Sequence, residues 1–394
     1  MFRLLFVITV IAVINADPQN IAFAENLETY SKANHDFALS LYTKLAEIET
    51  GNIIYSPLSI HVIMFMTSIG AVSKTLDEII KTIHLTNIKY SVEDYSAMLK
   101  RITDGYNNLK LVSAIFIDED FNVKDSFLAK SNLSPFWVYK SDFKNKHESW
   151  RQTINMWVSN KTEHKIEELF PKELIDANTA LVLVNAVHFK SPWVYKFYEI
   201  NKEPFYSYSK KIQSVKMMTL MHDLQYYHDM HLKYSAVELP YNYYNFKMII
   251  LLPDDKDGLK SLEKNLVNIN LNNIFKQMNE YHVSVKLPSF KIEQSLYLEE
   301  AFKRLGCSTM FTPRANFSKI SNKGGLYVNN LVHKAFIEVN ENGTLAAGAT
   351  GGSVSLLSLP LPRTKVQFTV DHPFLFFIVS EYNDIILLGR VLQV

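Results

Sequence analysis

The segment from residue 342 to residue 359 reads NGTLAAGATGGSVSLLSL and concentrates residues with very small side chains. It holds four of the chain's 12 glycines, namely Gly343, Gly348, Gly351 and Gly352. If the segment formed a strand, alternate residues would share one face, made of Thr344, Ala346, Gly348, Thr350 and Gly352. Such a face has no bulk to keep it out of an existing sheet, where its backbone would gain hydrogen bonds on both sides. The spacing predicts two states, an exposed loop and an inserted strand, with a flexible, mutation-tolerant surface loop as the alternative.

The residues at the end of this segment suit a protease substrate better than a catalyst. The run Leu356-Leu357-Ser358-Leu359 is apolar and is followed by Pro360 and Pro362, so an exposed backbone here would be open to cleavage. The chain has 12 histidines and many serines, but it contains no G-x-S-x-G, no H-E-x-x-H and no phosphate-cradling glycine loop. We therefore expect no catalytic residues, no metal site and no cofactor.

Two predicted strands, Val332 to Val339 and Lys365 to Val370, must hold the small-residue segment between them. The loop that joins them has about 25 residues, and structureless loops of that length are usually functional. Helices are predicted earlier, over Asn34 to Ile48 with one apolar face, after Ser56-Pro57, and around Ile154 to Val158. Further strands are expected at 111–117, 180–189, 248–252, 283–287, 374–379 and 385–388. Helices early and strands late predict an α+β fold.

The composition indicates one large globular domain. The 394 residues are 47% hydrophobic, and no Pro/Ser/Gly-rich linker or charge block divides them. The formal net charge is only +1, so we expect neither nucleic acid nor a membrane as a partner. The lysines between residues 74 and 110 alternate with acidic residues, which favours a solvated mixed face over a glycosaminoglycan site.

The N-terminus has the pattern of a secretory signal peptide. Arg3 precedes the apolar run from Leu4 to Ile14, and the small residue Ala16 suits cleavage before Asp17. We therefore expect residues 1–16 to be removed and residues 17–394 to form a secreted, extracellular domain. Cys307 is the single cysteine, and we expect a small buried hydrophobe there, with a free reactive thiol as the alternative.

Four Asn-x-Ser/Thr tripeptides could accept a glycan in a secreted protein, and we expect one or two of them to be used. They begin at Asn132, Asn160, Asn316 and Asn342. Asn342 is the one inside the small-residue segment, where a glycan would hinder insertion.

Several longer motifs resemble the serpin family of serine protease inhibitors. VHKAFIEVNENGTLAAGAT resembles the family's hinge, and DHPFLFFI resembles its C-terminal signature. NIIYSPLSI (52–60), INMWVSNKTEHKI (154–166), LVNAVHFKSPW (183–193), the Leu239-Pro240-Tyr241 tripeptide and VKLPSFKI (285–292) fit as well, in family order, between about residues 30 and 392. The resemblance implies a single serpin domain with about three β-sheets, helices mostly in the N-terminal half, and an exposed reactive-centre loop at about 341–365.

The resemblance also implies a suicide-substrate inhibitor. In serpins the scissile bond follows the seventeenth residue counted from the hinge glutamate, which matches Glu341 and places the bond at Leu357–Ser358. The bond Leu356–Leu357 is the runner-up, and Arg363 lies too late in the loop. Leucine suits a chymotrypsin-like or elastase-like serine protease with an apolar S1 pocket, bound by a monomeric inhibitor. The alternative is a non-inhibitory serpin that acts as a carrier, storage or signalling-binding protein.

Further residues match the family's hinge and the positions at which its main sheet opens. Glu341, Gly343 and the small residues Thr344, Ala346, Ala347, Gly348 and Ala349 match the hinge of inhibitory members, whereas Leu345 replaces the usual glutamate. The residues that match the family's sheet-opening positions are Ser56, Asn185, His333 and Trp193, with Lys190 beside the last. Ser73 and Ser191 stand where the family often has glycine.

Overall fold

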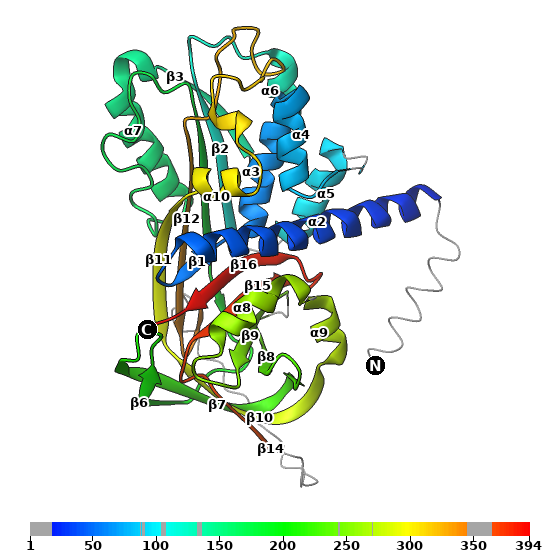
Figure 1. Cartoon of the computed structure of the whole chain (residues 1–394), viewed down its shortest axis with the longest axis vertical. Helices are drawn as coiled ribbons and strands as arrows, with labels where there is room; N and C mark the ends of the chain where they lie inside the picture. The colour runs from blue at the N-terminus through cyan, green and yellow to red at the C-terminus, as the bar shows by residue number, and fades with distance from the viewer. Residues whose placement is uncertain are drawn as a thin grey trace.

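Helices dominate the first 161 residues and strands dominate the rest (Figure 1). The computed structural model describes residues 18–86, 88, 91–103, 108–131, 136–242, 245–269, 271–344 and 365–394. The early helices are α2 (Pro18–Ile48), α3 (Pro57–Gly70), α4 (Ser73–Thr82), α5 (Val92–Thr103), α6 (Asp125–Ser131) and α7 (Phe143–Lys161). Shorter helices follow as α8 (Leu259–Asn265), η2 (Leu266–Asn268), α9 (Leu271–Gln277), α10 (Glu299–Arg304) and η3 (Thr309–Phe311). This distribution confirms the predicted α+β class.

Helix α3 begins where the sequence predicts it. The side chain of Ser56 accepts a hydrogen bond from the Ser59 backbone N–H, and Pro57 occupies the first turn, where a missing N–H does no harm. Nearly every side chain of α3 is buried, so it runs through the centre of the domain. Contacts with β2 and β4 place it against the seven-stranded sheet.

The seven-stranded sheet has the order β3 (Phe136–Ser141), β2 (Leu109–Asp118), β4 (Leu181–Phe189), β12 (Asn330–Asn340), β13 (Gly343–Thr344) and β5 (Ser191–Pro192), with β11 (Phe290–Tyr297) on the other edge of β12. Strands β4 and β12 pair in parallel from Val182/Asn330 to His188/Phe336. Strand β4 is buried along its whole length, as its unbroken apolar run predicts for a strand covered on both faces.

The second sheet has nine strands and falls into two portions along β7 (Ile212–Asp229). One portion holds β6 (Glu199–Tyr206), β10 (Asn279–Pro288) and β14 (Lys365–Thr369); the other holds β8 (Tyr234–Pro240), β9 (Phe246–Pro253), β15 (Phe374–Ser380), β16 (Ile385–Val391) and β1 (Ile53–Tyr55). Residues 212–226 of β7 pair with the first portion, and Tyr226–Asp229 pair with β8. The expected three sheets are therefore the seven-stranded sheet and these two portions, joined by one long strand.

Two apolar clusters hold the layers together. The larger packs α2, α3 and α5 against both sheets, and the smaller packs α7 onto the opposite face of β2, β4 and β12. Cys307 is buried in the larger cluster, as predicted, and burial raises the pKa of its thiol to about 12, so it stays protonated and unreactive. Within the described ranges, no helix is long and apolar enough to cross a membrane.

Candidate functional site

The predicted hinge lies at the end of β12, where the chain reverses direction. After a turn at Glu341 and Asn342, strand β13 pairs back on Val339 and Asn340 of β12. On its other side β13 pairs with Ser191 and Pro192 of β5. Beyond the end of β4, the two residues of β13 thus already occupy a place between two strands of the seven-stranded sheet.

Gly343 fits this place because it has no side chain. Its φ is +147°, which L side chains rarely adopt, and a Cβ would lie 2.3 Å from the Ser191 carbonyl oxygen and 2.5 Å from Pro192 Cα. Both obstacles are backbone atoms of β5, so they cannot move aside without breaking the pairing. The small residue at this hinge position is therefore required by a close backbone approach.

Thr344 is fully buried, and among the described residues its hydroxyl is hydrogen-bonded to one side chain. Its Oγ1 lies 2.6 Å from the hydroxyl oxygen of Tyr241, which is itself fully buried. Burial raises the pKa of Tyr241 above its usual value, so the phenol remains neutral and able to donate this hydrogen bond. The hinge is therefore held by a satisfied polar pair within an apolar surrounding.

Trp193 connects Tyr241 to the turn that precedes β13. The Trp193 and Tyr241 rings are stacked, with centroids 4.3 Å apart and an interplanar angle of 11°. The indole Nε1 donates to the Asn340 carbonyl at 2.9 Å, and the Trp193 backbone N–H donates to the Asn342 carbonyl at 3.0 Å. Trp193 therefore fixes the turn from one side while Tyr241 holds Thr344.

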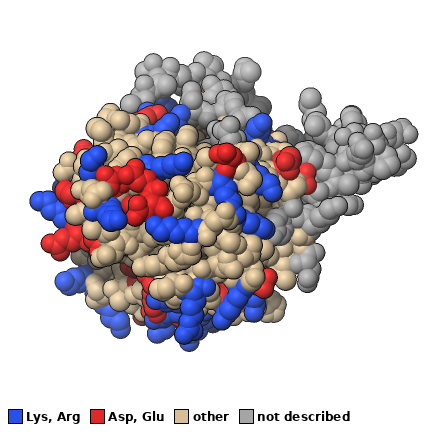
Figure 2. All heavy atoms as spheres, turned by 90° about the horizontal axis from the view of Figure 1, so that it is seen from above, with Lys and Arg blue, Asp and Glu red and all other residues tan. Residues whose placement is uncertain are grey.

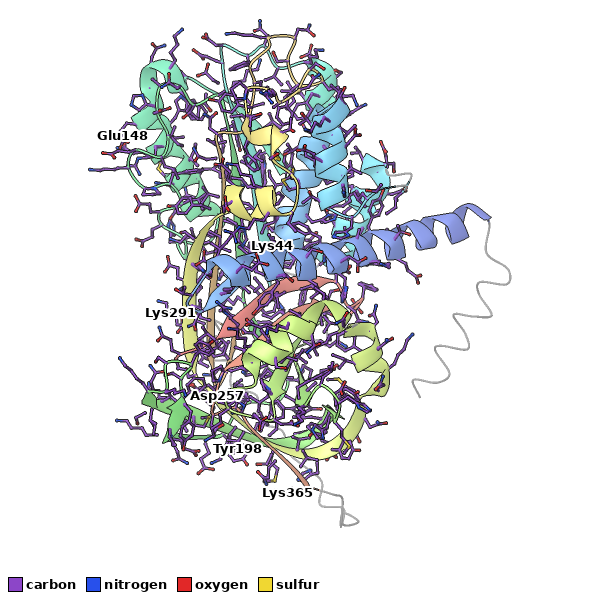
Figure 3. The ribbon with its side chains drawn as sticks, in the orientation of Figure 1. Lys44, Glu148, Tyr198, Asp257, Lys291 and Lys365 are labelled. Atoms are coloured by element: carbon purple, nitrogen blue, oxygen red, sulfur yellow. The ribbon has the colours of Figure 1, made fainter. Side chains whose placement is uncertain are left out.

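Both described ends of the segment 345–364 lie at one end of the molecule. The Phe197 backbone N–H donates to the Glu341 carbonyl at 3.1 Å, so Tyr198 lies next to the hinge. Figure 3 shows Tyr198 and Lys365, the first residue of β14, at the same end. This is the end opposite to α6 (Figure 1).

A second polar group joins the two central strands below the hinge. His333 of β12 faces Asn185 of β4 in the paired register, and His333 Nδ1 is hydrogen-bonded to Asn185 Oδ1. The Asn185 amide donates to Ser59 Oγ at 2.7 Å, to the Ser59 carbonyl at 2.8 Å and to Ser113 Oγ at 2.9 Å. We call Ser56, Ser59, Ser113, Asn185 and His333 the strand-crossing cluster.

The hydrogen bonds of this cluster define the state of His333. The Ser56 backbone N–H donates to His333 Nε2 at 3.0 Å, so Nε2 is an acceptor and Nδ1 carries the proton. Burial lowers the pKa of His333 to about 3, so the ring is neutral at pH 7. A neutral, doubly hydrogen-bonded imidazole therefore links α3, β4 and β12.

Together, these contacts describe a sheet that is open to a new strand at its end and closed below it. Between β12 and β5 the chain has placed Gly343 and Thr344, but β12 and β4 are still paired along Asn330–Phe336. For more of the segment to enter between β4 and β12, this ladder and the His333–Asn185 hydrogen bond must break. The entering strand would then restore a ladder on each side.

The structure divides the predicted site residues into two groups. Ser56, Asn185 and His333 meet in the strand-crossing cluster, whereas Trp193 lies with Gly343 and Thr344 at the hinge. The residues outside the described ranges are Leu345, Ala346, Ala347, Gly348, Ala349, Leu357 and Ser358, with Asn132 and the leader 1–16. Ser73 has φ 50°, in the region where glycine is favoured, which accounts for the family's glycine there.

The predicted glycan acceptors differ in exposure. Asn160, near the end of α7, and Asn316 are exposed, whereas Asn342 is half-buried and its Nδ2 donates to Glu341 Oε1 at 3.1 Å. The sequence alone assigned no role to Tyr241, Ser59 or Ser113. Tyr241 carried one signal, its place in the Leu-Pro-Tyr motif, but its partner Thr344 lies 103 residues away.

Among the described residues, no group of three or more His, Cys, Asp or Glu side chains is arranged to hold a metal ion. The described part of the site consists of a buried hinge, a paired β4–β12 ladder and a polar cluster between these strands.

Comparison with known proteins adds independent findings. The model of the family described as "Serpin (serine protease inhibitor)" matches residues 32–394. Leukocyte elastase inhibitor A from Mus musculus is 36% identical over 384 residues, which cover 93% of this chain and 99% of that protein. Leukocyte elastase inhibitor from Homo sapiens is 36% identical over 382 residues, which cover 92% and 99%.

Solved structures are similar over the same length. Serpin48 from the insect Tenebrio molitor superposes with a TM-score of 0.83 at 28% identity, covering 93% of this chain and 98% of that one. Uncleaved ovalbumin gives a TM-score of 0.82 at 26% identity, covering 92% and 99%.

Proposed function

The chain belongs to the serpin family of serine protease inhibitors, and from this premise we propose that it is a secreted suicide-substrate inhibitor. Its target would be a chymotrypsin-like or elastase-like serine protease. The names of the two elastase-inhibitor relatives support a serine protease as the partner. The apolar Leu357 supports an apolar S1 pocket.

The observation that carries the proposal is the position of Gly343 and Thr344. These two residues are paired on both sides, between β12 and β5, while the β4–β12 ladder below them is intact. A strand that continued from Thr344 in the same direction would run between β12 and β4. The position of the hinge therefore supports the insertion of a longer strand along the same line.

The proposed reaction begins as ordinary proteolysis. The protease serine attacks the carbonyl carbon of Leu357, the bond to the Ser358 nitrogen breaks, and Leu357 remains attached to the protease as an ester. The freed segment then inserts between β4 and β12 and gains two rows of backbone hydrogen bonds, which is the strand addition known for serpin loops. The attached protease is carried along before water hydrolyses the ester.

Secretion and glycosylation belong to the same proposal. The basic, apolar and small-residue regions of 1–16 support export, and the exposure of Asn160 and Asn316 supports their use as glycan acceptors. We propose a monomer that acts outside the cell.

A denaturing gel tests the function. The mature chain is mixed with chymotrypsin and, separately, with pancreatic elastase, and the control uses the same proteases with their active-site serine blocked beforehand. We expect a covalent band near the summed masses only with active protease, and a released C-terminal peptide that begins at Ser358 by mass spectrometry. Cleavage without the covalent band would contradict inhibition and favour a non-inhibitory carrier or storage role.

A further inference from the structure

A cavity of about 790 Å³ lies among four helices, in a different part of the fold from the hinge. Its walls come from the end of α3, the middle of α4, the start and one face of α5, the end of α6, and the segment around residue 319. The residues that line it are Ser68, Ile69, Leu76, Ser91, Val92, Glu93, Ser96, Ala97, Lys100, Ala129, Lys130 and Lys319. This volume is in the range of small-molecule sites.

The lining of the cavity is apolar in part: five of its twelve residues are apolar, three are serines and four are charged. Ile69, Leu76 and Val92 are only partly buried and pack with one side against the main core. Ala97 and Ala129 add small side chains that leave room between α5 and α6. Apolar surface that remains in a concave site on a folded protein is the usual basis for binding an apolar group.

Charged groups at the cavity are mostly of one sign. Among the described residues, three lysines and one glutamate line it: Lys100, Lys130, Lys319 and Glu93. Among the described residues, none of the three lysines forms an ion pair with an acidic group. Lysine in the last turn of α5 and of α6 is favoured by the helix dipole, but Lys319 lies on no helix.

We propose that this cavity binds an amphipathic anion, with an apolar chain or ring in the space between the helices and a carboxylate or sulfate head at the lysines. The apolar residues of the lining favour the body of such a ligand, and the excess of positive charge favours its head. Three lysines from three separate segments converge on one cavity, which a single amphipathic helix face does not explain.

The surroundings favour a small ligand over an extended polyanion. Figure 2 shows the end of the molecule that carries α6, where basic and acidic side chains are interspersed and no continuous basic tract appears on the visible face. A sulfated polysaccharide needs several cations along a path, whereas a fatty acid needs one cationic cluster beside an apolar space. The apolar residues of the concave lining would contribute nothing to binding a polysaccharide.

The test uses the whole mature chain and the fluorescent fatty acid cis-parinarate as the probe. We expect saturable binding at one site, displacement by decanoate at a concentration at least tenfold lower than by decanol, and no displacement by inorganic sulfate. Native protein saturated with decanoate should also melt at a higher temperature, because the ligand binds the folded state.

Variants locate the site. The triple variant Lys100→Glu/Lys130→Glu/Lys319→Glu should bind parinarate at least tenfold more weakly, and Ala97→Phe should block the cavity by filling it. The matched control reverses three exposed lysines elsewhere, Lys140→Glu/Lys211→Glu/Lys264→Glu, and should bind like the parent. If the control variant lost as much parinarate affinity as the triple variant, the change in net charge would explain the loss and the proposal would be overturned.

Two further results would overturn it. If Ala97→Phe, folded with the parent melting temperature, bound parinarate as the parent does, the ligand would lie elsewhere. If heparin displaced the probe and bound the parent in a salt-dependent way that Ala97→Phe left unchanged, the lysines would form a polyanion surface instead.

Discussion

Replacing Thr344 by arginine tests the hinge at its most enclosed position. Thr344 is fully buried between β12 and β5, and its hydroxyl is hydrogen-bonded to the neutral Tyr241 hydroxyl. No acidic side chain is in hydrogen-bond contact with Thr344 in the described structure, so a guanidinium there would have no charge partner. Burying an unpaired charge costs roughly 4 kcal/mol after relaxation. Thr344→Arg should therefore expel β13 from the sheet.

The substitution should change the fraction of acyl-enzyme that is trapped by insertion and the fraction that is released by ester hydrolysis. If half of that penalty is felt in the transition state for insertion, about 2 kcal/mol, insertion slows about 30-fold. A parent that inserts about ten times faster than the ester hydrolyses would then insert about three times more slowly than hydrolysis. The variant should be cleaved mainly as a substrate.

The assay titrates a fixed amount of protease with inhibitor and measures the stoichiometry of inhibition, with a gel for each mixture. The matched controls are Thr344→Ser, which keeps the hydroxyl, and Thr344→Val, which keeps the shape; both should remain inhibitors. If Thr344→Arg still inhibited with a stoichiometry near one, Thr344 would not be on the inserting face and the reasoning would be wrong.

Three other substitutions probe the hinge, the strand-crossing cluster and the scissile bond. Tyr241→Phe leaves the Thr344 hydroxyl without its partner and should lower the free energy of unfolding by about 1 kcal/mol, seen by calorimetry as a melting temperature about 1–2 °C lower. Adding Thr344→Val to Tyr241→Phe should cause no further loss of stability. If the stability losses of the two substitutions added up in the double variant, the hydrogen bond between the two hydroxyls would be contradicted. Burial lowers the pKa of His333 from 6.5 to about 3, so between these pH values the unfolded chain binds more protons than the folded chain and the free energy of unfolding falls as the pH falls. His333 alone accounts for a loss of about 2 kcal/mol between pH 7.5 and 5, and denaturant unfolding of His333→Gln should show a pH dependence smaller by that amount. An unchanged pH dependence would contradict the buried neutral imidazole. Leu357→Arg should lower the rate of inhibition of chymotrypsin and raise that of trypsin, each by roughly 100-fold, and unchanged rates would place the scissile bond elsewhere.

Local signals predicted the elements that surround the site. The Ser56-Pro57 pair predicted the start of α3 because a capping hydroxyl and a fixed φ act within one turn. The unbroken apolar run at 180–189 predicted the buried strand β4 because burial on both faces needs no alternation. The hinge alternation placed Thr344 on an inward face, and the structure buries that residue.

Other features could not be predicted from the sequence and became visible only in the folded structure. Helix α2 begins at Pro18, well before the predicted Asn34, because its earlier turns lack the regular apolar face on which the prediction depended. The length of β7, which joins two portions of one sheet, follows from pairing with three strands and has no local signature. The Tyr241–Thr344 contact joins residues 103 positions apart, and only the fold brings them together.

The central claim is that the intact chain is not in its most stable arrangement and that cleavage near Leu357 lets the segment insert between β4 and β12. Calorimetry of the intact chain and of the same chain nicked in the 353–359 region measures this directly. We predict that the nicked form melts at a much higher temperature, because it has gained two rows of ladder hydrogen bonds. A nicked form that melts at the same temperature as the intact chain, or lower, would contradict the claim.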